Sequence, residues 1–142
     1  MILKFGKKII EEESKALLVL SNLLDKSFIY AVRKISECKG NIIFSGVGKS
    51  GYIARKISST LTSTGTPSIF IHATEASHGD LGFIRKKDLL VLISNSGNTR
   101  ELIDISKLSF LNGNNVILIT SNKKSLISKF ASNVILLPKI KE

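Results

Sequence analysis

The chain has 142 residues, of which 43% are hydrophobic and 23% charged, as expected for one globular domain. Its single cysteine, Cys38, cannot form an internal disulfide, which excludes a disulfide-scaffolded secreted fold and indicates a reducing compartment, the cytoplasm. No apolar run approaches the roughly 20 residues of a membrane-spanning helix, and the N-terminus lacks the apolar core of a signal peptide. We therefore expect neither secretion nor a membrane partner.

The net charge of +10 comes from 21 Lys and Arg residues against 11 Asp and Glu residues. Such an excess is typical of proteins that bind nucleic acids. Here, however, the basic runs are short and scattered along the chain, and Trp is absent. Dispersed charges of this kind are typical of a solvated surface. We therefore expect no nucleic-acid partner.

Two helices are expected first, over residues 4–24 and from about residue 27 to residue 39. In the first, apolar side chains recur at near-helical spacing around the acidic residues 11–13. Asp25 or Ser27 can cap the second helix, and Gly40 marks its end.

Five short runs of apolar residues follow, at 41–44, 68–71, 89–93, 115–119 and 134–137. They are continuously apolar, as strands buried on both faces of a sheet must be. Helical stretches are expected between them at 50–63, 99–112 and 125–132, while the stretch between the second and third runs is the least regular. The alternation predicts an α/β fold, a flavodoxin-like, doubly wound, five-stranded parallel sheet preceded by two helices. We expect one domain over residues 1–142, with the helices in 1–39 and the binding core in 40–142.

Small, hydroxyl-rich loops follow three of the predicted strands, at 45–51, 94–99 and 120–122. Ligands of open α/β sheets bind beyond the carboxyl ends of the strands. Exposed amides at helix starts make such turns anion sites, and hydroxyl groups add further donors. Ser, Thr, Asn and Gly also form ordinary turns, but three such loops at one end of one sheet favour binding of a phosphate or sugar phosphate.

Two nucleotide-binding motifs are disfavoured. A P-loop needs a glycine five positions before Gly48, where Ile43 stands. A G-x-G-x-x-G pattern is formed by Gly46, Gly48 and Gly51. It requires an acidic residue about 20 residues later, at the end of the next strand. That strand end has none, and the nearest carboxylate is that of Glu75. A dinucleotide site is therefore the weaker interpretation.

Several titratable residues lie near these loops. His72 and His78 flank Glu75 after the second strand, where they can face a ligand, although their spacing matches no standard metal signature. Glu101 begins the helix after the third strand, where it either complements the helix dipole or acts as a base toward a bound sugar. Lys49 lies inside the glycine turn and is either a surface lysine or a cation for a phosphate or an enediolate.

Four motifs together resemble the sugar isomerase (SIS) domain, and more narrowly its arabinose 5-phosphate isomerases: residues 46–51, 63–68, 75–82 and 93–99. The resemblance implies interconversion of D-ribulose 5-phosphate and D-arabinose 5-phosphate, a step toward Kdo and lipopolysaccharide. It also implies that no cofactor is required and that the protein forms homo-oligomers, which are tetramers in the family.

The resemblance also implies roles for individual residues. It gives catalytic importance to Lys49, Glu101 and Glu142. It gives phosphate binding to Ser50, Ser94, Ser96 and Thr99, and further substrate contacts to Gly65, Thr66, His72 and His78. In some members the counterpart of His72 binds an inhibitory zinc ion. The implied reaction passes through a cis-enediolate, with Glu101 as the base and Lys49 stabilising the oxyanion; Glu101 and Glu142 can exchange roles.

The sequence departs from the family at two places. Gly97-Asn98 stands where the family usually has Gly-Glu, and the family continues beyond the position of Glu142 with a further helix, a functional histidine and often CBS modules. We therefore expect a core that is incomplete at its C-terminal end and exposes apolar surface. Three alternatives stay open: a non-catalytic sugar-phosphate-binding module, a shortened or decayed isomerase, and an SIS isomerase acting on a phosphorylated heptose or hexulose.

Overall fold

A five-stranded parallel sheet forms the centre of the molecule. The computed structural model describes residues 1–77 and 80–140. The strands are β1 (Ile42–Gly46), β2 (Ser68–Phe70), β3 (Leu89–Ile93), β4 (Asn115–Thr120) and β5 (Asn133–Leu136). They are all parallel and lie in the order β2-β1-β3-β4-β5. This is the flavodoxin-like order, so the predicted sheet is confirmed.

The strand order reverses at β1, which pairs with β2 on one side and β3 on the other. Phe44 of β1 lies opposite both Phe70 and Val91. The loops that leave β1 and β3 therefore diverge to opposite faces of the sheet and open a crevice between them. This is the place in such sheets where ligands bind.

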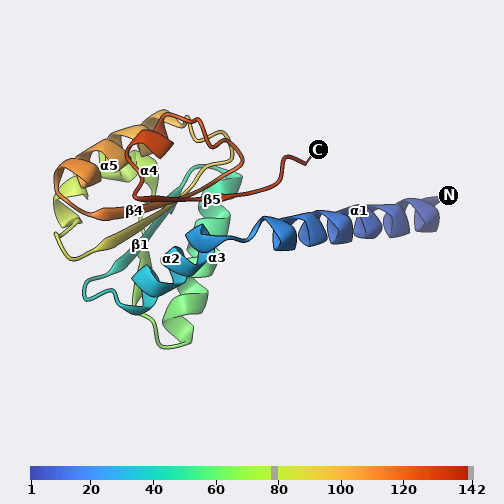
Figure 1. Ribbon diagram of the computed structural model, residues 1–142, viewed down its shortest axis with the longest axis horizontal. Helices are drawn as coiled ribbons and strands as arrows, with labels where there is room; N and C mark the ends of the chain where they lie inside the picture. Colours follow the sequence, from blue (N-terminus) through green and yellow to red (C-terminus); the bar gives the residue numbers. More distant parts are fainter. Residues whose placement is uncertain (78–79, 141–142) are drawn as a thin grey trace.

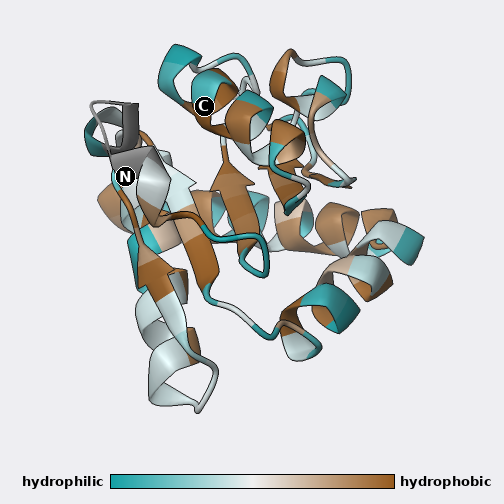
Figure 2. Ribbon diagram, turned by 90° about the vertical axis from the view of Figure 1, so that its left-hand side faces the viewer, coloured by the Kyte–Doolittle hydropathy of each residue, from teal (hydrophilic) through white to brown (hydrophobic). Residues whose placement is uncertain are grey.

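Helices cover both faces of the sheet (Figure 1). On one face, α2 (Lys26–Ser36) and α3 (Lys49–Ser63) cover a core that includes Phe44 and Val91. On the other, α4 (Ala73–Ser77) and α5 (Arg100–Leu111) cover a core that includes Ile43 and Leu90. Neighbouring strand residues alternate between the two cores, and the hydrophobic strands lie between the helical layers in Figure 2.

The first helix, α1 (Ile2–Leu23), extends away from this body and has no buried residue (Figure 1). A break at Leu24 and Asp25 separates it from α2, and the Asp25 carboxylate accepts a hydrogen bond from the Ser27 amide at 2.8 Å. Hydrogen bonds from the Ser27 side chain and backbone lower the pKa of Asp25. In the described part of the chain, no helix has the length and apolar character needed to cross a membrane.

The predicted helix over residues 125–132 is wrong, because only one 3₁₀ turn, η2 (Ile127–Lys129), forms there. The Leu126 amide donates to Asn98 Oδ1 at 2.8 Å, and the Ile127 amide donates to the Gly97 carbonyl at 3.1 Å. These donors hold the segment against the loop after β3 instead of starting an α-helix. The irregular stretch between β2 and β3 contains α4 and a second 3₁₀ turn, η1 (Asp80–Phe83).

Candidate functional site

The glycine turn after β1 brings the end of the strand close to the start of α3. A Cβ atom on Gly46 would lie 2.9 Å from the Gly51 amide nitrogen, so only glycine fits there without a shift. Gly48 has a φ of 58° and caps α3 without a side-chain hydrogen bond. The first amides of α3 are thus left for a ligand, next to the side chains of Lys49 and Ser50.

The turn after β3 draws three predicted phosphate-binding residues together. The buried Ser94 hydroxyl lies 3.0 Å from Thr99 Oγ1 and accepts a hydrogen bond from the Gly97 amide at 3.1 Å. Ser96 is exposed, and its Oγ accepts from the Asn98 amide at 3.2 Å. Ser94 therefore braces a compact turn that presents Ser96 and the start of α5 to the outside. Phosphate binding by this turn stays a prediction.

The loop after β4 supports this turn, and anion binding by residues 120–122 stays a prediction. Thr120 and Ser121 both donate their hydroxyl hydrogens to the Asn95 carbonyl, at 3.0 and 2.9 Å. The Asn122 amide group donates to the Ser96 carbonyl at 3.1 Å. The polar side chains that suggested an anion site at residues 120–122 hold the neighbouring loop in place.

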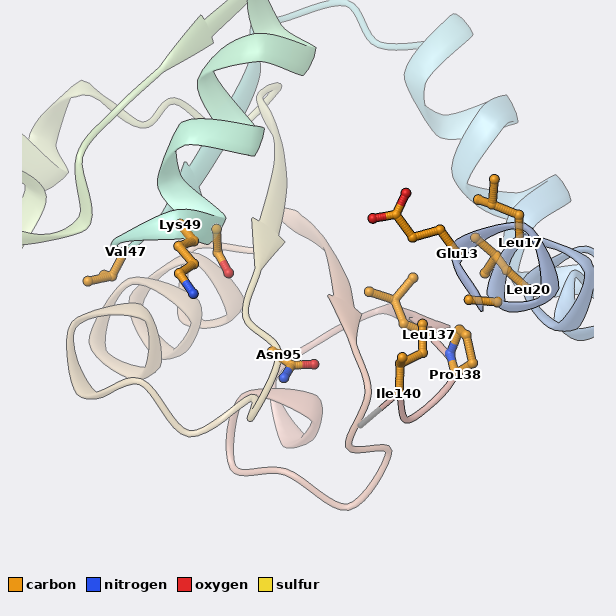
Figure 3. Close-up of a pocket in the computed structure, with 11 residues that line it drawn as sticks. Glu13, Leu17, Leu20, Val47, Lys49, Asn95, Leu137, Pro138 and Ile140 are labelled. Carbon is orange, nitrogen blue, oxygen red and sulfur yellow. The ribbon is translucent and has the colours of Figure 1, made fainter. Parts of the chain in front are cut away.

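A hollow of about 850 Å³ lies between these loops and α1 (Figure 3). One wall carries Lys49, Ser50 and Asn95, and the other is formed by α1 and by residues 137–140, which follow β5. The volume lies within the range of about 300–1,000 Å³ that is usual for small-molecule sites. Lys49 and Ser50 thus line this hollow, and their roles stay predictions; Asn95, which the sequence analysis did not single out, lines it as well.

Glu101 lies in the first turn of α5, partly buried, and it is not among the residues that line this hollow. Within the described residues its side chain makes no hydrogen bond or ion pair, so its carboxylate is available to a ligand. The positive end of the α5 dipole lies beside it. The role of Glu101 as a base stays a prediction.

His72 follows β2 and lies next to the glycine turn. Its ring packs edge-on against Phe70, with centroids 6.3 Å apart, and its Nδ1 accepts a hydrogen bond from the Thr74 amide at 3.3 Å. A cavity of about 260 Å³ joins His72 to Gly48 and Arg55, whose guanidinium lies 5.0 Å from the centre of the Phe70 ring. Arg55 is a cation beside the site that sequence reasoning missed, although it follows Gly51 by one helical turn and lines the same cavity.

A metal at His72 stays a prediction. Within residues 1–77 and 80–140, no three His, Cys, Asp or Glu side chains are grouped to hold a metal ion. The Thr74 amide occupies Nδ1, which leaves only Nε2 of His72 for a ligand. The predicted site residues His78 and Glu142 lie outside the described residues.

Gly65 and Thr66 lie at the amino end of β2, away from the other predicted site residues. They end α3 in a Schellman motif, in which Gly65 has a φ of 92° and the Thr66 amide donates to the Leu61 carbonyl at 2.8 Å. A five-residue strand such as β1 is about 16 Å long, which separates the two ends of the sheet. Within one copy of the chain, Gly65 and Thr66 cannot share a small ligand with Lys49, so the predicted contact would need a second copy.

The comparison with protein families agrees with this architecture. Residues 34–142 match the SIS domain, and the chain belongs to this family. Among curated proteins, it is 48% identical over 130 residues to "Arabinose 5-phosphate isomerase KpsF" of Escherichia coli O6:H1, covering 91% of this chain. It is 44% identical over 136 residues, 94% of this chain, to "Probable arabinose 5-phosphate isomerase" of Haemophilus influenzae.

Solved structures show the same fold. The c3406 protein of E. coli CFT073, solved in complex with arabinose 5-phosphate, superposes with a TM-score of 0.88 at 37% identity, over 99% of this chain and 75% of that chain. A crystal structure from Listeria monocytogenes has a TM-score of 0.93 at 33% identity, over 99% of this chain and 74% of that one. The chain spans about 40% of the length of the two curated relatives.

Proposed function

We propose that this chain forms the sugar-phosphate site of an isomerase that interconverts D-ribulose 5-phosphate and D-arabinose 5-phosphate. The observation that carries the proposal is the placement of Lys49 and Ser50 on the same wall as Asn95, at the crevice between β1 and β3. The relatives named arabinose 5-phosphate isomerase support the choice of substrate. So does the solved relative from E. coli CFT073 that holds arabinose 5-phosphate.

In the proposed reaction, Ser50 and the turn formed by Ser94, Ser96 and Thr99 hold the phosphate. The Glu101 carboxylate removes the proton from C2 of the aldose, and the electron pair forms a cis-enediolate whose oxyanion Lys49 stabilises. Glu101 returns the proton to C1, and the hydroxyl proton of O2 moves to O1 as the C2 carbonyl forms. The exchange is redox-neutral and uses only side chains of this kind, so the proposal includes no cofactor.

The proposal also includes a cellular setting. The single cysteine suits a reducing compartment, so we place the reaction in the cytoplasm. Its product, D-arabinose 5-phosphate, would serve Kdo synthesis for lipopolysaccharide.

The direct test is incubation of the folded chain with D-ribulose 5-phosphate, with product detected by NMR and binding measured by isothermal titration calorimetry. Formation of D-arabinose 5-phosphate supports the proposal. Binding without turnover would identify a non-catalytic sugar-phosphate-binding module. Faster turnover of a phosphorylated heptose or hexulose would reassign the substrate, and a folded sample that neither binds nor reacts would contradict the proposal.

We further propose that the chain self-associates, because the first half of α1, which does not line the hollow, exposes large apolar side chains. Ile2, Phe5 and Ile10 are 91%, 65% and 68% exposed. Light scattering should report a mass at least twice the 15.5 kDa of one chain. The double variant Phe5→Ser/Ile10→Ser should lower that mass, whereas Lys7→Ser, a polar control on the same helix, should not. A monodisperse wild-type monomer would contradict this prediction.

A further inference from the structure

Glu13 is a carboxylate on the apolar face of α1. Glu13, Ala16, Leu17 and Leu20 follow one another at the helical spacing i, i+3, i+4 and i+7, and all four line the hollow. This stripe is not buried in the chain, since α1 has no buried residue, so the Glu13 carboxylate stays solvated beside the hollow.

Its two neighbours in the sequence have different surroundings. All three glutamates are exposed, and the Glu12 carboxylate pairs with Lys8 at 3.7 Å. Glu11 lines a separate surface depression with Lys7 and Lys8. Within the described residues, the Glu13 side chain makes no hydrogen bond or ion pair. Of the three consecutive glutamates, Glu13 is therefore the one that faces the hollow with its carboxylate unpaired.

The opposite wall of the hollow is suited to a phosphate. Figure 3 shows the Glu13 side chain reaching from α1 into the hollow, toward the side where Lys49 and Asn95 lie. The rest of the lining is mostly apolar and includes Val47 and Leu137. The hollow thus has a cation and amides at one side and a lone carboxylate at the other.

This separation of charge suits a ligand with two unlike ends. A carboxylate accepts strong hydrogen bonds from hydroxyl groups but repels a phosphate. A sugar phosphate with its phosphate at the glycine turn, and with C1 and C2 near Lys49 and Glu101 as proposed above, would turn the hydroxyl groups of C3 and C4 toward α1. We infer that Glu13 is a substrate-binding residue that accepts hydrogen bonds from the sugar hydroxyls and so favours sugar phosphates over bare phosphate. This inference rests on the proposed function.

Two ligands and a matched variant separate this role from a general charge effect. We would titrate wild type, Glu13→Gln and Glu12→Gln with D-arabinose 5-phosphate and with inorganic phosphate by calorimetry. Glutamine keeps an acceptor oxygen but not the charge, and hydrogen bonds to charged groups are about twice as strong as neutral ones, which makes roughly a tenfold difference in affinity. Glu13→Gln should therefore weaken D-arabinose 5-phosphate binding about tenfold while leaving phosphate affinity equal or higher. Glu12→Gln removes the same charge from the same helix and should leave the ratio of the two affinities unchanged.

Several results would overturn the inference. If wild type binds the sugar phosphate and Glu13→Gln leaves the affinity ratio unchanged, this role of Glu13 is wrong while the proposed function stands. A matching change of the ratio in Glu12→Gln would show a non-specific charge effect. If wild type binds neither ligand, the proposed function fails first and the inference fails with it. Circular dichroism of each variant shows that a loss of binding is not a loss of fold.

Discussion

Glu101→Gln should lower isomerase turnover by at least about 100-fold while leaving substrate affinity nearly unchanged. Proton transfer by a positioned base typically contributes about 10²–10⁴-fold to the rate. Glutamine keeps the size and most hydrogen bonds of glutamate but cannot carry the proton between C2 and C1. Values of kcat and KM from a coupled assay, with Kd from calorimetry, separate the loss of chemistry from a loss of binding.

Two further variants sharpen this prediction. Ser96→Ala should have the opposite effect and weaken binding more than turnover, because the Ser96 hydroxyl lies at the exposed side of the turn that is predicted to hold the phosphate. Asp104→Asn removes a charge from an exposed position one turn further along α5 and should change neither quantity. If Glu101→Gln behaves like Ser96→Ala, Glu101 is a binding residue and the base is Glu142 or a histidine.

The sheet could be predicted from the sequence because its strands are buried on both faces. A run such as Leu89–Ile93 is apolar at every position, which only a strand with helices on both sides requires. The segment at residues 125–132 could not be predicted in this way. An α-helix does not form there because the amides of Leu126 and Ile127 donate hydrogen bonds to Asn98 and Gly97 instead. These two acceptors lie far away in the sequence.

The candidate site could be predicted where it follows strand ends and not where it depends on tertiary contacts. Lys49 and Ser50 follow β1 directly, so the general rule for ligand position in parallel sheets locates them. Glu13 joins the hollow only because α1 lies across from the glycine turn, and nothing in the run of three glutamates shows this. Gly65 and Thr66 are the opposite case, residues that the sequence suggested for the site but that lie away from it. Their motif ends a helix at the other end of the sheet.

Gly97 is the position where one methyl group should disturb both the fold and the site. Its φ of 64° is in the left-handed region, which costs other residues roughly 1–2 kcal/mol. A Cβ atom at Gly97 would also overlap the side chain of the buried Ser125, and overpacking of this kind adds about 1–3 kcal/mol. Gly97→Ala should therefore lower the free energy of unfolding by about 2–5 kcal/mol, measured by urea denaturation.

Gly113→Ala is the matched control, because Gly113 has a φ of 80° but no atom within 4 Å of a new Cβ. It should show the backbone cost alone, about 1–2 kcal/mol. Gly97→Ala should also weaken phosphate binding, since the Gly97 amide donates to Ser94 and its carbonyl accepts from Ile127. Equal destabilisation by the two variants would mean that Ser125 moves aside at little cost. Gly97 would then shape the site through its backbone conformation alone, and the phosphate affinity of Gly97→Ala would measure that effect directly.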